Sequence, residues 1–213
     1  MSKVLYIVAN PSTEEASYSL SIGRAFLNAY KSNNPMDEII ELDLYKMAIP
    51  LIDTDVLNAW ELLRSHASFD SLSAIQQEKL ESIHALTDQF VAADKYIVIS
   101  PLWNLSIPPM LKAYIDTVVI ADKTFMYTAN GPEGLLKGKK GIHIQARGGT
   151  YSGDKSFLEF GDSYLRTIMS FLGIDMMESI IAEGMAYSPE KAAEIKLAAV
   201  HLSQSAAKEM ASA

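Results

Sequence analysis

The chain contains no cysteine at any of its 213 positions. This absence excludes disulfide bonds and thiolate chemistry, and it leaves only histidine, aspartate and glutamate as side chains for a metal. His66 and His84 lie in polar or helical surroundings and have no partner at ligand spacing. We therefore interpret both histidines as surface or packing residues and expect no metal site.

Basic residues are also scarce. Lysine and arginine number 18 against 26 aspartates and glutamates, which gives a net charge of −8, and no basic run interrupts this balance. Such a chain is poorly suited to nucleic acid, so we expect no nucleic-acid partner. The first residues carry one charge, lack the long apolar core of a signal peptide and lead directly into a strand. We expect no membrane span and a cytoplasmic location.

What the chain does contain is an alternation of strands and helices. Hydrophobic residues make up 49% and charged residues 21%, which is typical of an ordinary globular protein, and we expect one domain over 1–213. Apolar runs predict strands at 4–8, 38–44, 97–99, 141–145 and 179–184. Helical segments separate these strands. The order predicts an α/β fold with a five-stranded, doubly wound parallel sheet between helices.

The most unusual loop follows the third predicted strand. Ser100 and Pro101 end that strand, because proline has no N–H for a sheet ladder. Leu102, Trp103 and Leu105 then make the loop apolar, although connecting loops are usually polar. A loop that plugs the sheet edge would explain this composition. The alternative is a cover for a flat apolar ligand, since ligands bind at the carboxyl edge of open α/β sheets.

The loop after the first strand contains no glycine, so it matches neither the dinucleotide fingerprint nor a Walker loop. Ser17, Tyr18 and Ser19 stand where a helix over 20–31 begins. Free N–H groups and serine hydroxyls favour an anion there, although a plain N-cap explains a lone Ser-x-Ser. A phosphate in this loop would be held without lysine, which suits a bound monoester better than triphosphate transfer.

Two later loops complete the set. The segment 123–140 is rich in turns and hairpin-like. It carries Phe125 and Tyr127, which, considered alone, are better explained as anchors that pack this loop down than as ligand contacts. Gly148 and Gly149 follow the fourth strand, where they permit either a close backbone approach to a ligand or an ordinary tight turn. Three loops of unusual chemistry therefore follow strands of one predicted sheet.

These motifs, taken in order, resemble the bacterial FMN-dependent NADH azoreductases. The resemblance rests on Val4-Leu-Tyr-Ile-Val8, Ser17-Tyr-Ser19, Ser100-Pro-Leu-Trp-Asn-Leu105, Asn130-Gly-Pro-Glu-Gly134, Gln145-Ala-Arg-Gly-Gly149 and Ala182-Glu-Gly184, and it covers nearly the whole chain. It implies a flavodoxin-like fold and a homodimeric reductase of quinones and azo dyes. Two positions depart from the usual pattern, because Ala146 replaces a common Ser and Leu105 replaces a common Phe.

The resemblance implies contacts to FMN from all three loops. Ser17, Tyr18 and Ser19 would hold the phosphate, with Asn10 a weaker candidate, and the apolar loop would wrap the isoalloxazine. Arg147, Gly148 and Gly149 would line its pyrimidine edge. The full expected set of cofactor residues is Asn10, Ser17, Tyr18, Ser19, Pro101, Leu102, Trp103, Asn104, Leu105, Gln145, Ala146, Arg147, Gly148, Gly149 and Tyr151.

The expected activity is ping-pong transfer of two electrons from NADH through FMN to quinones or aromatic azo compounds, with no catalytic side chain. The alternatives are a flavodoxin-type electron carrier and a non-flavin domain of the same fold. Planar aromatic substrates would contact Trp60, Phe125, Tyr127 and Phe171.

We expect a homodimer with one FMN per subunit, because the helix after Pro109 carries apolar residues on several sides and these aromatics lie on outlying segments. A monomer with folded-back loops is the alternative.

Overall fold

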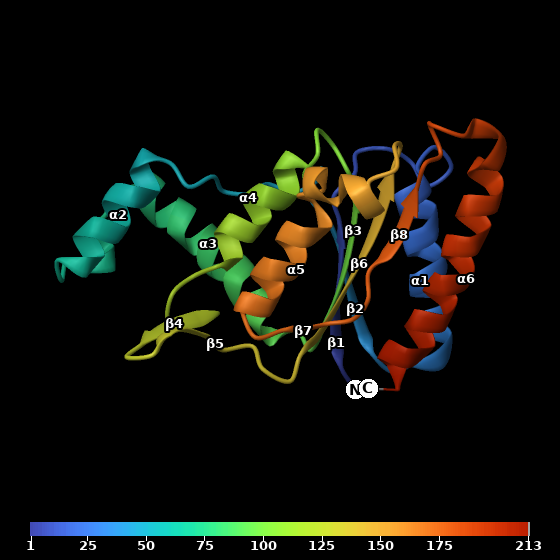
Figure 1. Ribbon diagram of the computed structural model, residues 1–213. Helices are drawn as coiled ribbons and strands as arrows, with labels where there is room; N and C mark the ends of the chain where they lie inside the picture. The colour runs from blue at the N-terminus through green and yellow to red at the C-terminus, as the bar shows by residue number, and fades with distance from the viewer. Residues whose placement is uncertain (213) are drawn as a thin grey trace.

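Strands of one parallel sheet form the centre of the molecule, with helices on both faces (Figure 1). The computed structural model describes residues 1–212. The strands of the sheet are β1 (Lys3–Val8), β2 (Glu38–Asp43), β3 (Lys95–Pro101), β6 (Lys140–Arg147), β7 (Asp175–Met176) and β8 (Ile180–Glu183). The helices are α1 (Tyr18–Asn33), α2 (Thr54–Arg64), α3 (Ala74–Ala92), α4 (Pro109–Val118), α5 (Asp162–Phe171) and α6 (Ala192–Ala211).

The strand order is β2-β1-β3-β6, and both β7 and β8 pair with β6. All pairings in this sheet are parallel. The predicted doubly wound sheet is therefore confirmed, and all five predicted strands are present. The two-residue β7 is an addition, because so short a strand leaves no periodic signal in the sequence. The chain reverses its winding direction at β1 and β3, and a crevice forms at the carboxyl ends of strands around such a switch point.

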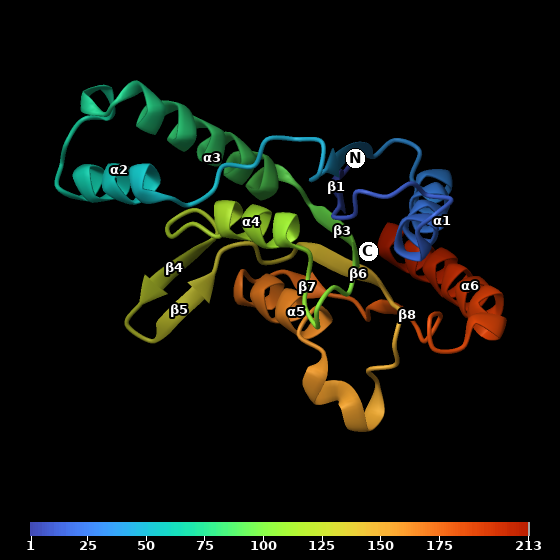
Figure 2. The ribbon, with the colours of Figure 1, turned by 90° about the horizontal axis from the view of Figure 1, so that it is seen from above.

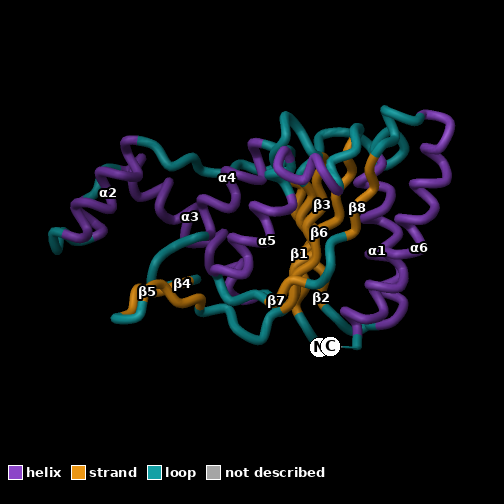
Figure 3. Tube along the Cα trace, in the orientation of Figure 1, coloured by secondary structure: helices purple, strands orange, loops and turns teal. Residues whose placement is uncertain are grey.

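Alternation along the strands divides the core between the two faces of the sheet. Tyr6 and Ile97 face α1 and α6, whereas Ile7 and Val98 face α3, α4 and α5. Figure 3 shows the sheet as a central layer between these two groups of helices. Because β1, β3 and β6 are buried on both faces, their sequences are apolar almost throughout.

An arm extends away from the sheet on the side of α3 and α4 (Figure 2). It consists of α2, the adjoining part of α3 and the antiparallel hairpin of β4 (Phe125–Thr128) and β5 (Gly131–Gly134). Its small core contains Val56, Ala59, Leu72, Leu80 and Ile83. The hairpin-like segment expected over 123–140 is thus confirmed.

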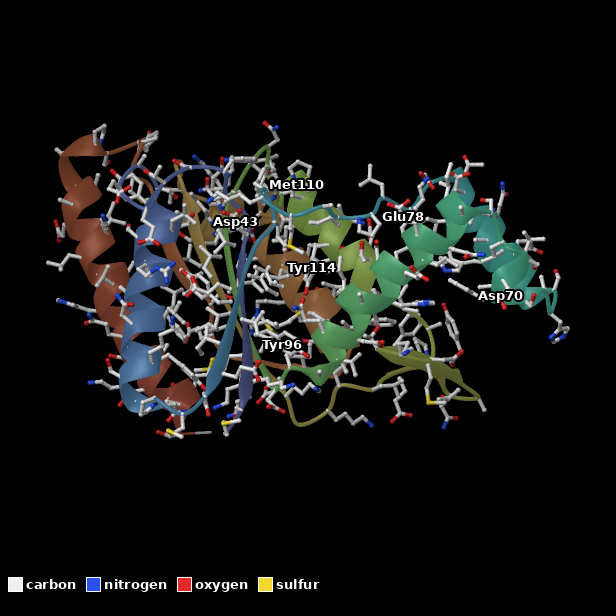
Figure 4. The ribbon with its side chains drawn as sticks, turned by 180° about the vertical axis from the view of Figure 1, so that it is seen from behind. Asp43, Asp70, Glu78, Tyr96, Met110 and Tyr114 are labelled. Carbon is white, nitrogen blue, oxygen red and sulfur yellow. The ribbon has the colours of Figure 1, made fainter. Side chains whose placement is uncertain are left out.

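Helix α4 corrects one argument made from the sequence. Six apolar residues were expected to need a second subunit as cover: Leu111, Tyr114, Ile115, Val118, Val119 and Ile120. The first four are each at most 5% exposed in the single chain, whereas Val119 and Ile120, just beyond the helix, are only partly buried. The Tyr114 ring lies 6.2 Å from the Phe90 ring, and Phe90 in turn packs on Tyr96 at 4.5 Å. Figure 4 shows both tyrosines between the sheet and the neighbouring helices. Helices α3 and α5 therefore supply the cover expected from a partner.

No helix within residues 1–212 is long and apolar enough to cross a membrane.

Candidate functional site

A cavity of about 560 Å³ opens at the carboxyl edge of the sheet. The loops that follow β1, β3, β6 and β8 all contribute to it. Its lining consists of Asn10, Ser12, Ala16, Ser17, Tyr18, Ser19, Pro101, Leu102, Trp103, Ala146, Arg147, Gly148, Met185 and Ala186. The volume falls within the range of cofactor and small-molecule sites, and the position is the one that an open α/β sheet offers to ligands.

A buried hydroxyl cluster lies at one end of the cavity, where α1 begins. The Asn10 amide nitrogen donates to the hydroxyl oxygens of Ser17 at 2.9 Å and Ser19 at 3.3 Å, and these two oxygens are 3.2 Å apart. Ser17 is also the N-cap of α1 and accepts from the Leu20 N–H. The N-cap interpretation of Ser17 is thus correct, but it does not exclude an anion site. Asn10, a weaker candidate in the sequence, is the centre of the cluster.

One acidic residue of this loop, Glu14, has a cationic partner. Glu14 accepts from Arg24 Nε at 2.7 Å, and the same guanidinium pairs with Glu41. The Glu14 charge, which would repel a phosphate, is therefore partly offset within the chain by Arg24.

The apolar loop after β3 is held in a tight turn. Trp103 and Ser106 exchange two backbone hydrogen bonds of 2.9 Å, and Asn104 and Leu105 between them have φ values of 47° and 68°. Asparagine tolerates this left-handed region, but a leucine there costs of order 1–3 kcal/mol. The turn leaves the Trp103 side chain 39% exposed, between this cavity and a second one lined by Asn104 and Tyr164. Backbone strain of this kind is concentrated at functional sites.

Arg147 lies at the opposite end of the cavity and is only 6% exposed. Its Nε donates to Gln145 Oε1 at 2.7 Å, and its terminal nitrogens lie 3.4 Å from Glu159 and 3.5 Å from Glu183. Burial opposes ionisation of Glu183, but hydrogen bonds from Ser152 and the Tyr151 N–H, with the Arg147 charge, outweigh burial and lower its pKa. The arginine thus ties three segments together and keeps little unshared charge for a ligand.

Of the two glycines beside Arg147, Gly148 presents its backbone to the cavity. Among residues 1–212, the N–H groups of Gly148 and Gly149 donate no hydrogen bond, while their carbonyls accept from Ala186 and Gly184. A Cβ added to Gly148 would lie 3.3 Å from the Ala186 Cβ. The backbone at Gly148 is therefore open to the cavity, as a close approach to a ligand requires.

The structure brings ten of the fifteen expected cofactor residues together around the cavity. The other five do not line it. Asn104 borders the neighbouring cavity, Leu105 lies on the turn, and Gln145 is completely buried behind Arg147. Gly149 is covered by the ring of Tyr151 at 3.2 Å from its added Cβ.

Four lining residues were missed in the sequence: Ser12, Ala16, Met185 and Ala186. Met185 and Ala186 follow the last strand at the same edge, so the rule that located the other loops would have found them. Ser12 and Ala16 carry no comparable signal.

None of the four expected substrate residues lines this cavity within one chain. Phe125 is only 8% exposed, and its ring lies 5.0 Å from Phe171 and 5.4 Å from Tyr127. The expectation that Phe125 is displayed is therefore wrong, and its alternative role as an anchor of the hairpin is correct. Tyr127 is 74% exposed, and Trp60 lines a separate cavity of about 580 Å³ on the arm.

Comparison with known proteins decides the family. A family model described as flavodoxin-like fold matches residues 2–206. An FMN-dependent NADH:quinone oxidoreductase of Bacillus pumilus is 54% identical over 201 residues, which is 94% of this chain and 95% of that protein. A protein of the same name from Geobacillus kaustophilus is 51% identical over the same shares. The chain belongs to the flavodoxin-like FMN-dependent NADH:quinone oxidoreductases.

Solved structures agree with this membership. An azoreductase from Bacillus anthracis str. Sterne superposes with a TM-score of 0.91 at 36% identity and covers 98% of this chain and 100% of its own. An FMN-dependent NADH-azoreductase from Bacillus anthracis str. Ames Ancestor, solved in complex with FMN, has a TM-score of 0.91 at 34% identity, over 99% and 100% of the two chains. The resemblance inferred from the motifs is confirmed.

Proposed function

We propose that this chain binds FMN at the carboxyl edge of its sheet and catalyses reduction of quinones and aromatic azo compounds by NADH. The observation that carries the proposal is the composition of the 560 Å³ cavity. Hydroxyl donors lie at one end, an apolar wall lies in the middle, and unpaired backbone N–H groups lie at the other end. An FMN-dependent NADH:quinone oxidoreductase that is 54% identical to this chain supports the same activity.

The residues present fit FMN from end to end. The phosphate would meet the N-terminus of α1 and the hydroxyls of Ser17 and Ser19, which Asn10 holds in place. Pro101, Leu102 and Trp103 would cover the flat ring system. The free N–H group of Gly148 lies at the cavity and, with that of Gly149 next to it, suits a carbonyl or anionic ring edge. A side chain at Gly148 would be crowded by Ala186. No lysine lines the cavity within residues 1–212, in agreement with a resident monoester.

Bound FMN would supply the two-electron chemistry between NADH and the acceptor. The chain's own contribution is binding, shielding and electrostatics. The Gly148 and Gly149 N–H groups would stabilise negative charge on the reduced cofactor, because preorganised donors in a partly dry site cost no reorganisation. Trp103 and its loop would exclude water from one side. NADH and the acceptor would use the remaining opening in turn, which gives ping-pong kinetics.

The proposed enzyme is a homodimer with one FMN per subunit and sites shared between subunits. This is supported by the arm, where Trp60, Val119 and Ile120 line an open cavity of about 580 Å³ and Tyr127 is exposed. A second chain would bring such aromatics to the mouth of the FMN site, where planar substrates enter. Because NADH is an intracellular reductant, we propose that the enzyme is located in the cytoplasm. The dimer is tested by sedimentation mass across dilution with activity followed in parallel, and a fully active monomer would contradict it.

The test of the activity is optical. The purified protein should be yellow, anaerobic NADH should bleach the flavin absorbance, and a quinone should restore it without oxygen. A flavodoxin-type carrier would also be yellow but would not be bleached by NADH without a separate reductase. A colourless protein that does not bind added FMN would contradict the proposal altogether.

A further inference from the structure

A series of hydrogen-bonded polar side chains, two of them fully buried and two partly buried, lies next to the loop of Pro101, Leu102 and Trp103 (the FMN loop) and does not line the cavity. His143, in the middle of β6, is 0% exposed. Its Nε2 lies 2.9 Å from the Ser100 hydroxyl, and its Nδ1 lies 2.8 Å from Asp162 Oδ1. The same carboxylate oxygen accepts from the Ser179 hydroxyl at 2.6 Å. Four segments, namely the end of β3, β6, the start of α5 and the approach to β8, are joined in this way.

The direction of the hydrogen bonds follows from the groups involved. Burial alone would raise the pKa of Asp162, but hydrogen bonds from His143 and Ser179 and the charge of Arg166 lower it. A carboxylate only accepts, so His143 Nδ1 donates to Asp162, and Nε2 is left to pair with the Ser100 hydroxyl. The order serine, histidine, aspartate is that of a nucleophilic triad. However, Ser100 is 0% exposed and does not line the cavity, so no substrate reaches its oxygen.

Both ends of this hydrogen-bonded series of side chains lie beside the FMN loop. Ser100 directly precedes Pro101 and Leu102, which form the cavity wall. On the other side, Gly161 directly precedes Asp162, and a Cβ added to it would lie 2.7 Å from Leu102 Cδ1. The Phe160 N–H also donates to the Leu105 carbonyl at 2.9 Å. The start of α5 and the FMN loop are therefore in contact. His143 is hydrogen-bonded to Ser100, next to the loop, and to Asp162, at the start of α5.

Stability does not explain this arrangement. Most of this face of the sheet is filled by apolar side chains such as Tyr96 and Val98, and replacing a buried polar set by apolar groups of similar shape is often neutral or stabilising. Apolar side chains at these positions would not fix the orientation of their neighbours, because apolar contacts are not directional. Hydrogen bonds of fixed geometry at both ring nitrogens set the separation of Ser100 and Asp162, which packing alone does not specify.

We propose that His143 is a positioning residue for the cofactor: through Ser100 and Asp162 it sets where the loop of Pro101, Leu102 and Trp103 lies against bound FMN. The inference rests on the proposed function and adds to it, since no residue of this hydrogen-bonded series lines the cavity.

The test compares Ser100→Ala and His143→Leu with a matched control elsewhere in the core. Thr87→Val is suitable, because the Thr87 hydroxyl is equally buried and donates to carbonyls of Ile83 and Thr117, joining α3 to α4 away from the loop. The measurements are the FMN dissociation constant by fluorescence titration, the visible circular dichroism of bound flavin, and the melting temperature. Ser100→Ala, which removes one oxygen, keeps the test valid where His143→Leu does not fold.

We expect Ser100→Ala and His143→Leu to weaken FMN binding about tenfold, the effect of one buried hydrogen bond, and to change the flavin circular dichroism. Thr87→Val should lower the melting temperature while leaving both flavin measurements at wild-type values. His143→Gln, whose amide reaches the Nε2 position, should bind FMN better than His143→Leu. Variants that differ from wild type only in melting temperature, as the control does, would overturn the positioning role alone. A wild-type protein with no affinity for FMN would overturn the proposed function instead.

Discussion

The carboxyl edge of the sheet and the arm differ in how completely one chain builds them. At the edge, buried polar groups such as Asn10, Ser17 and Arg147 have partners within the chain. On the arm, Tyr127 and Leu57 are 74% and 54% exposed, and Trp60 borders an open cavity. Within one chain, these polar groups of the edge are therefore already paired, whereas the aromatic surface of the arm has no cover.

The largest effect is expected from the two aromatic residues of the hairpin. Phe125→Ala should cost about 3–5 kcal/mol of unfolding free energy, the usual cost of removing a buried phenylalanine. Tyr127→Ala should change the unfolding free energy by less than about 0.5 kcal/mol, since its ring is 74% exposed, and should instead alter KM for the quinone or the dimer dissociation constant. Urea titrations at one protein concentration, together with kinetics, separate the two outcomes.

Equal destabilisation by both variants would show that the hairpin is one packing unit with no exposed recognition surface. Unchanged KM and dimer affinity in Tyr127→Ala would remove Tyr127 from the proposed shared site.

The second effect concerns the hydroxyl cluster at the edge. Changing Ser17 and Ser19 together to Ala should weaken FMN binding by about 1–3 kcal/mol, because hydrogen bonds to a charged phosphate are lost. Ser21→Ala in the same helix is the control, since the Ser21 hydroxyl donates to the Tyr18 carbonyl and does not line the cavity. Fluorescence titration gives both dissociation constants. An unchanged constant in the double variant would mean that the serines only cap α1.

Sequence patterns predicted more of the edge than of the arm, for a physical reason. Strands buried on both faces are apolar runs, and their carboxyl ends lie together, so the three loops could be located from local sequence. The contacts of Arg147 with Glu159 and Glu183 could not, because the partners lie 12 and 36 residues away on other elements. Neither could the left-handed conformation of Leu105, which no local rule favours. On the arm, burial of Phe125 depends on its packing against Phe171, which lies 46 residues away on α5 and leaves no local signal.

The third effect compares the two tryptophans, one in each region. Trp103→Ala should weaken FMN binding by about 1 kcal/mol, the scale of an aromatic contact, with little loss of stability because the side chain is 39% exposed. Trp60→Ala on the arm should leave the FMN dissociation constant unchanged. A Trp103→Ala protein that unfolds readily but keeps its FMN affinity would identify Trp103 as a packing residue.

The smallest effect is expected from Glu183, which supports the edge through Arg147 and the 151–152 backbone. Its pKa in the folded protein is lowered from 4.5, so its contribution to stability is fully present above about pH 5 and is lost as the pH falls through the lowered value. Wild type should therefore exceed Glu183→Gln in unfolding free energy by less than about 1 kcal/mol at pH 7, since glutamine keeps the shape and one acceptor oxygen and loses only the charge. The difference should shrink towards pH 3.

Urea titrations at pH 7, 5, 4 and 3 measure this difference, and Glu190→Gln at an exposed position is the control. A difference that stays constant down to pH 3 would show that Glu183 acts through packing and not through its charge.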